Sequence, residues 1–157
     1  MPVFRTSRRV SHSAQAMFDL VADVEQYPAF VPLCVALKVR KRAVNAQGAE
    51  VLTADMEIGY RAIREKFTSR VTLDRKNLRI LCTYIDGPFS HMDNRWDFAP
   101  EPGSAEKCRV EFFIDYGFRS RTFTVLMGSL FDTAFRKFAG AFEARADAVY
   151  GRGGAPG

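Results

Sequence analysis

Side chains able to bind a metal or to act as nucleophiles are few and widely separated in this chain. His12 and His91 are the only histidines, and neither lies at a spacing that would hold a metal together with cysteines or carboxylates. Cys34, Cys82 and Cys108 are an odd number at wide intervals, which is typical of reduced thiols packed in a core. No glycine-rich phosphate loop or nucleophile elbow occurs in the sequence. We therefore expect no metal site and no catalytic cofactor.

Acid or base catalysis would need a carboxylate or a phenol that faces the protein interior. Glu65 shares strand parity with Phe67 and is therefore expected to face inward. A buried carboxylate is costly unless it is paired, and Arg95 or Arg119 could supply the partner. An enzyme that uses an internal acid or base would depend on Glu65 or Tyr84, which are the only candidates we identify.

The chain is basic, with 23 Lys and Arg against 18 Asp and Glu and a formal net charge of +5. An acidic partner such as RNA or an anionic membrane surface would fit this sign. The excess is modest, however, and only the segment 38–42 is dense in positive charge. Its alternation is typical of one solvated strand face, so charge alone identifies no partner and we expect no DNA binding.

The elements that must position these side chains follow from hydrophobic periodicity. From Val35 to Phe118 the period is two, and Gly, Pro, Asn and Asp mark turns between the apolar runs. Alternation gives the sheet one apolar face and one wet face, with Asp55 and Glu57 on the wet one. We expect strands at about 35–44, 50–58, 61–74, 78–86, 90–99 and 107–118.

One long amphipathic helix is expected from Thr122 to Tyr150, with Ser120 as its N-cap. At about 1.5 Å per residue it would run roughly 40 Å, and its Phe-rich side needs a cover that the sheet can supply. Arg145 falls on the midline of the apolar stripe, so we expect the apolar wall to stop before it and the last turns to be solvated.

The remaining segments complete an α+β arrangement. We expect a strand over residues 2–11 and a short helix capped by Ser13, followed by an irregular apolar segment, Tyr27–Cys34, that contains two prolines and forms the rim of a pocket. Residues 1–150 are expected to form one domain and 151–157 a disordered tail. Since no apolar run is long enough to span a bilayer and no secretory signal is visible, we expect a cytoplasmic protein, with peripheral contact with the inner membrane as its only membrane association.

Several spaced motifs occur in order over nearly the whole chain, from about Val3 to Ala148. They are Leu20–Cys34, Leu52–Tyr60 with Arg64-Glu65 and Phe67–Arg70, Gly87–Phe89 with Asn94–Trp96 and Phe98, and Phe118–Ser120. Together they resemble the coenzyme-Q-binding branch of the START-domain superfamily. The only departures are mild: Tyr60 and Met92 stand where this family commonly has Phe and Leu.

The resemblance implies a helix-grip fold, in which a curved antiparallel sheet wraps a long C-terminal helix and leaves a hydrophobic tunnel between them. It also implies binding of ubiquinone or a related isoprenoid quinone, in support of respiratory electron transfer and quinone biosynthesis, without catalysis. Contact with a membrane or a respiratory complex would accompany transfer of the quinone. Burial of apolar carbon contributes about 0.8 kcal/mol per methylene, so no elaborate polar site is required.

The tunnel wall is expected to come from the rim, the strands and the helix. The residues we predict to line it are Phe30, Val31, Leu33, Met56, Ile58, Phe67, Trp96, Phe112, Met127, Phe131, Phe135 and Phe138. Taken singly, each of these side chains could equally belong to an ordinary packed core.

Two alternatives follow from the same resemblance. A relative with these motifs is a bacterial toxin that blocks association of ribosomal subunits, and such an activity would use the outer basic surface. That surface would comprise Arg5, Arg8, Arg9, Lys38, Arg40 and Arg42. More distant relatives are polyketide cyclases, whose chemistry would need Glu65 or Tyr84 to face the tunnel.

Overall fold

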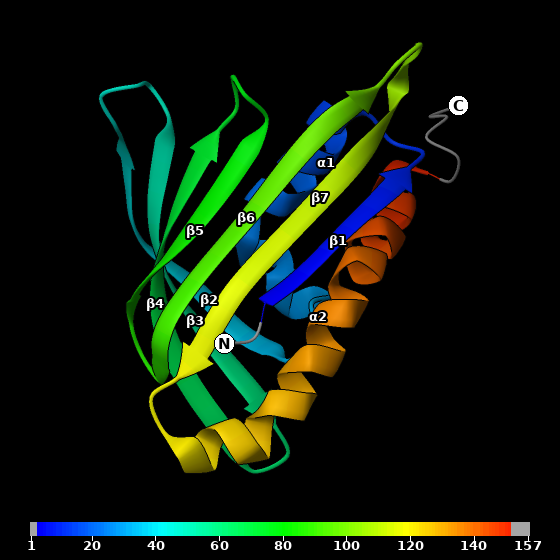
Figure 1. The fold of residues 1–157 in the computed structure, drawn as a ribbon. Coiled ribbons are helices and arrows are strands. Elements are labelled where there is room, and N and C mark those ends of the chain that lie inside the picture. Colours follow the sequence, from blue (N-terminus) through cyan, green and yellow to red (C-terminus); the bar gives the residue numbers. More distant parts are fainter. Residues whose placement is uncertain (1–2, 152–157) are drawn as a thin grey trace.

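A curved antiparallel sheet of seven strands wraps the long helix α2 (Figure 1). The computed structural model describes residues 3–151, so the expected tail lies, apart from Gly151, outside the described residues. The strand order is β1-β7-β6-β5-β4-β3-β2. The elements are β1 Val3–Val10, α1 Ala14–Ala22, the 3₁₀ helix η1 Val24–Ala29, β2 Cys34–Val44, β3 Glu50–Tyr60, β4 Ile63–Asp74, β5 Arg79–Asp86, β6 Phe89–Glu101, β7 Ser104–Phe118 and α2 Arg121–Tyr150.

Short polar turns join consecutive strands from β2 to β7. In the β2–β3 turn the Asn45 Oδ1 atom accepts hydrogen bonds from the backbone N–H groups of Gln47 at 3.0 Å and Ala49 at 2.9 Å. Gly48, between these two donors, has a φ angle of 83°, which residues with a side chain rarely adopt. The turn residues that the sequence marks therefore fix the antiparallel pairing that builds the sheet.

The first strand lies far from the second in the sheet. β1 pairs with β7 at one edge, whereas β2 forms the opposite edge. The chain crosses between these edges through α1 and η1. Ser13 caps α1, because its Oγ accepts a hydrogen bond from the Ala16 backbone N–H at 3.0 Å. This crossover places η1 at one end of the sheet, where it meets α2.

Strand alternation separates the two faces of the sheet as expected. Leu52 and Val71 face α2 and are no more than 5% exposed. Asp55 points to the opposite face, where its carboxylate accepts a hydrogen bond from the Thr68 hydroxyl at 2.6 Å and pairs with Arg40 at 2.9 Å. The apolar side chains of neighbouring strands therefore meet on the face that α2 covers.

Helix α2 starts where the sequence predicts. The Ser120 Oγ accepts a hydrogen bond from the Phe123 backbone N–H at 3.1 Å, which satisfies one of the free donors of the first turn. Phe131, Phe135 and Phe142 are buried on the side toward the sheet, while Val125 is exposed. Within residues 3–151 no helix combines the length and the apolarity that crossing a membrane requires.

The expectation of a solvated C-terminal end of α2 is wrong. Ala146 is fully buried, the Asp147 carboxylate lies 2.7 Å from His12 Nε2, and the Tyr150 hydroxyl donates a hydrogen bond to the Ala16 carbonyl at 3.1 Å. Arg145 is accommodated because its guanidinium lies 5.2 Å from the centre of the Phe30 ring. The last turns of α2 are therefore docked on α1 and the β1–α1 junction.

Replacement of Phe142 by alanine is expected to lower the free energy of unfolding by about 3–5 kcal/mol. The Phe142 ring is 1% exposed, and its centre lies 4.9 Å from that of Trp96 and 5.0 Å from that of Phe30. Urea denaturation measures the change. Val125→Ala on the same helix is the control, because Val125 is 81% exposed and its loss should change stability by less than about 0.5 kcal/mol. Equal effects of the two substitutions would contradict the packing described here.

Candidate ligand-binding cavity

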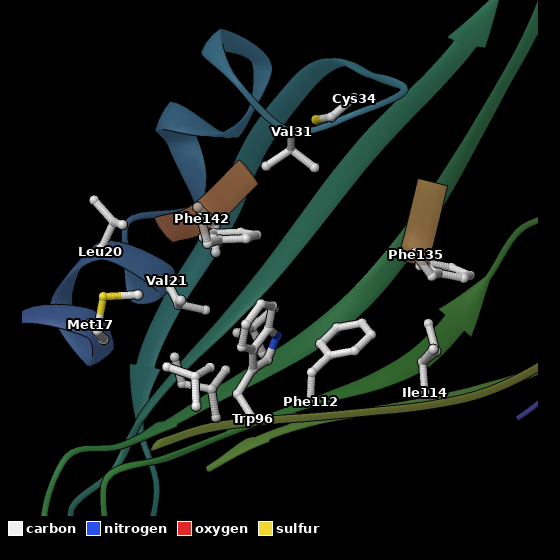
Figure 2. Packing of buried hydrophobic residues seen from close by; sticks show 14 of the residues in the cluster. Met17, Leu20, Val21, Val31, Cys34, Trp96, Phe112, Ile114, Phe135 and Phe142 are labelled. Carbon is white, nitrogen blue, oxygen red and sulfur yellow. The ribbon is translucent and has the colours of Figure 1, made fainter. Parts of the chain in front are cut away.

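A cavity of about 100 Å³ lies between the sheet and α2. Strands β3 to β7 form its floor, α2 forms its roof, and η1 with the segment that follows closes one end. Figure 2 shows Phe135 and Phe142 reaching from α2 toward the sheet, where Trp96, Phe112 and Ile114 stand on neighbouring strands. The helix and the sheet therefore do not close completely on each other.

Ten of the twelve predicted wall residues line this cavity. They are Val31, Leu33, Met56, Ile58, Phe67, Trp96, Phe112, Phe131, Phe135 and Phe138. Phe30 does not line it, because its ring turns away to pack against Phe142 and under Arg145. Met127 lies one helical turn before the roof residues and is buried in the core at 2% exposure.

The remaining lining residues lie outside the predicted wall set, although Tyr27 belongs to the segment Tyr27–Cys34 that the sequence predicts as the rim. Tyr27 comes from η1, Leu37 from the edge strand β2, and Ser69, Cys82 and Asn94 from the middle strands β4, β5 and β6. Strand parity contains the signal for Asn94, which lies between the inward-facing Met92 and Trp96. A polar side chain at an inward-facing strand position, as at Asn94, is thus the sequence feature that indicates a polar group in the cavity wall.

The cavity wall carries no charge, since none of the described residues that line it is acidic, basic or histidine. Its polar groups are held neutral. The Tyr27 hydroxyl donates a hydrogen bond to the Val21 carbonyl at 2.5 Å, and burial raises the pKa of Tyr27 well above its ordinary value. Burial also raises the pKa of Cys82 to about 11, although a hydrogen bond with the Ser69 hydroxyl acts in the opposite direction. An uncharged, largely apolar molecule suits this wall.

The internal acid or base that catalysis would need is not found at the predicted positions. Glu65 lies outside the cavity, in a groove at the β7–α2 junction that Arg119 also lines, and no ion pair of Glu65 occurs among residues 3–151. Arg95 pairs with Asp93 at 2.8 Å instead, so the expected buried ion pair is absent from the described structure. Parity does not place Glu65 in the cavity, because the part of β4 that lines the cavity starts only at Phe67.

Tyr84 is also unavailable to the cavity. Its hydroxyl accepts a hydrogen bond from the Phe89 backbone N–H at 3.1 Å, and the two rings pack edge to face at 5.6 Å. Among the described residues, no group of three or more His, Cys, Asp and Glu side chains is arranged to hold a metal ion. The three cysteines are free thiols, as the sequence predicts.

The chain is similar in sequence to a family of known proteins over most of its length. Residues 10–143 match the family model described as polyketide cyclase / dehydrase and lipid transport. The chain is 32% identical to the ribosome association toxin RatA of Escherichia coli, over 96% of this chain and 90% of that protein. It is 30% identical to the coenzyme Q-binding protein COQ10 homolog B of Xenopus laevis, over 95% of this chain but only 59% of that protein.

The fold has solved counterparts. A START superfamily protein from Mycobacterium smegmatis superposes with a TM-score of 0.75, over 94% of this chain and 98% of the other, at 16% sequence identity. At that identity the likeness shows the fold alone. It confirms the predicted helix-grip arrangement of a curved sheet around a long C-terminal helix.

The free energy of unfolding is expected to fall as the pH rises from about 9 to about 11. Burial raises the pKa of the Cys34, Cys82 and Cys108 thiols from 9.0 to about 11, so the folded chain holds protons that the unfolded chain releases. The contribution of the buried thiols to the free energy of unfolding is therefore fully present below the pKa of the unfolded chain, 9.0. It is lost as the pH rises through the folded-state pKa of about 11. Denaturant titrations at pH about 8 and about 10.5 measure the difference. Cys82→Ala should make the decline shallower, whereas a pH-independent stability would contradict the assigned burial.

Proposed function

Because the chain belongs to the polyketide cyclase / dehydrase and lipid transport family, we propose that it binds ubiquinone or a related isoprenoid quinone between the sheet and α2. It would do so without catalysis, in support of respiratory electron transport and quinone biosynthesis. The observation that carries this proposal is the cavity itself, whose described lining residues include no charged side chain. The COQ10 homologue, named as a coenzyme Q-binding protein, supports the same choice of ligand.

The energetics favour a prenyl tail as the main source of affinity. One isoprene unit contributes five carbon atoms, so its burial is worth about 4 kcal/mol before the costs of ordering the ligand. Aromatic rings from both the floor and the roof, such as Trp96, Phe112 and Phe135, offer broad apolar surfaces to such a tail. Few polar contacts are needed for tight binding.

The size of the cavity indicates that uptake must widen it. A volume of about 100 Å³ is smaller than the ~150 Å³ of an engineered cavity that accepts benzene, and much smaller than a typical ligand pocket. The C-terminal half of α2 is tied down by Arg8–Glu143 at 2.6 Å and His12–Asp147 at 2.7 Å. The first turns carry the exposed Val125 and Leu126 instead. Widening would therefore displace residues 121–138 of α2 and the partly exposed rim at Leu33.

The rim also provides the place for delivery. Pro32 and Leu33 line the cavity and remain partly exposed, so an apolar path leads from the interior to the surface. A membrane or a respiratory complex would contact this rim transiently while the quinone is transferred.

Ribosome binding is the second candidate function, and the identity to RatA over 96% of this chain favours it. The basic surface predicted for it is split, since β1 and β2 lie at opposite edges of the sheet. Several of its members are also engaged in ion pairs, namely Arg8 with Glu143, Arg40 with Asp55, and Arg42 with Glu25 and Glu50. Salt-sensitive co-sedimentation with ribosomal subunits that is lost in an R40E/R42E variant, with quinone binding unchanged, would support this second function.

Catalysis of the cyclase type is the candidate function with the least support. The two candidate acids or bases, Glu65 and Tyr84, do not line the cavity. The one thiol on the middle of the floor, Cys82, has a pKa raised to about 11 and so is protonated at neutral pH. These features favour a binding protein.

The protein purified from its natural host is expected to carry a quinone that mass spectrometry of the extracted lipid identifies. Ala134→Leu should lower the bound quinone at least tenfold, because Ala134 belongs to the roof and a larger side chain there fills the cavity. Ala144→Leu is the matched control, since Ala144 is an exposed residue of the same helix and its replacement leaves the cavity open. Circular dichroism verifies that both variants fold. Wild-type protein that neither carries quinone nor takes up added quinone would falsify the proposal.

A further inference from the structure

The floor of the cavity contains one polar spot. Ser69 of β4, Cys82 of β5 and Asn94 of β6 line the cavity from three adjacent strands, and we refer to them as the floor cluster. Cys82 lies opposite Asn94 in the β5–β6 register and opposite Val71 in the β4–β5 register, so Ser69 is its diagonal neighbour. The rest of the floor around these three side chains is apolar.

The floor cluster has hydrogen-bonding capacity that the protein does not use. The Asn94 amide nitrogen donates to the Phe113 carbonyl at 2.9 Å, which fixes the orientation of the amide group. Among residues 3–151 its second N–H and its carbonyl oxygen have no partner. The Ser69 side chain is buried at 5% exposure beside the Cys82 sulfur, which is a weak hydrogen-bond partner, so its single O–H can turn to a stronger acceptor. The Asn94 amide is only partly buried, and its remaining donor and acceptor positions face an otherwise apolar cavity, so they can bond to polar atoms that a ligand brings.

We propose that the floor cluster binds a ring carbonyl oxygen of a quinone head group, with Asn94 and Ser69 as the hydrogen-bond donors. The inference rests on the proposed function and adds the position of the head group. The ring enters the cavity first and lies near Trp96, while the prenyl tail runs out past Leu33 and Met56, which line the cavity and are partly exposed.

Cys82 fits a place beside a quinone ring. Quinone rings are electrophiles that react with thiolates, but burial keeps the Cys82 thiol protonated at neutral pH by raising its pKa to about 11. The cluster can therefore contact the ring without forming a bond to it, and the ligand can leave unchanged. Cys82 then contributes shape and a weak polar contact.

Trp96 provides a built-in reporter of binding, because it is the single tryptophan of the chain and lines the cavity two residues from Asn94. Quinones quench indole fluorescence on contact. The full chain is titrated with a short-tailed ubiquinone, and a prenyl hydrocarbon without carbonyl groups is measured by its competition with that quinone. Ser69→Ala and Asn94→Leu remove the donors. Thr83→Ala is the control, since Thr83 neighbours Cys82 in β5 but is exposed on the opposite face.

Each floor-cluster variant is expected to raise the Kd for the quinone about threefold to tenfold, and the Kd for the hydrocarbon should not rise. Thr83→Ala should change neither value. The infrared band of one carbonyl of the bound quinone should lie below its position in a hydrocarbon solvent in the wild-type complex, and each variant should move it back. Thermal unfolding verifies that the variants are folded. If one variant is not folded, the position of the carbonyl band in the wild-type complex alone tests whether the carbonyl is hydrogen-bonded.

Two results separate this inference from the proposal on which it rests. If the wild type binds the quinone but its carbonyl bands stay at their hydrocarbon position, or both variants bind it as tightly as the wild type, the head group does not reach the floor cluster. The inference then fails, while quinone binding stands. If the wild type shows no saturable quenching by any quinone, both fail together.

Discussion

The packing of α2 against the sheet at Phe142 is the contact on which the cavity depends. The Phe142 ring meets Trp96 from the floor, Tyr27 from η1 and Phe30 just after η1, all at centroid distances between 4.9 and 5.3 Å. Together with the Asp147–His12 pair, it fixes the C-terminal half of the helix at one end of the sheet. Because the helix is anchored there while the sheet curves, the space between them is left for side chains to fill (Figure 1).

Aromatic rings only partly fill that space. Phe135 packs edge to face on Tyr116 at 5.1 Å and on Phe138 at 5.1 Å, and Phe131 packs on Phe118 at 5.1 Å. Such rigid, bulky contacts hold the helix and the sheet at a set separation, and they leave an apolar void where neither surface supplies a ring. The same contacts that stabilise the fold thus create the wall to which an apolar ligand can bind, as Figure 2 illustrates.

The sequence predicts the strands and helix α2 better than it predicts the cavity between them. Period-two alternation and turn residues such as Asn45 specify the strands, and the Phe stripe with its Ser120 cap specifies α2. Strand parity does not locate Glu65 correctly, because an inward-facing residue reaches the cavity only where its strand runs beneath it, and β4 does so from Phe67 onward. The solvated end inferred from Arg145 fails because a long side chain can place its charge over an aromatic ring while its neighbour Ala146 stays buried. Whether apolar residues pack or line a cavity depends on sheet curvature, which local periodicity does not encode.

A structure of the protein bound to a short-tailed ubiquinone would test directly whether the quinone lies between α2 and the sheet. We expect the ligand between α2 and the sheet, in contact with Trp96 and Phe135, inside a cavity larger than about 100 Å³. Residues 121–138 should be displaced, while the C-terminal half of α2 keeps its contacts at Phe142 and Asp147. A quinone bound on the outer face of the sheet, with the cavity unchanged, would show that the space between α2 and the sheet is not the binding site.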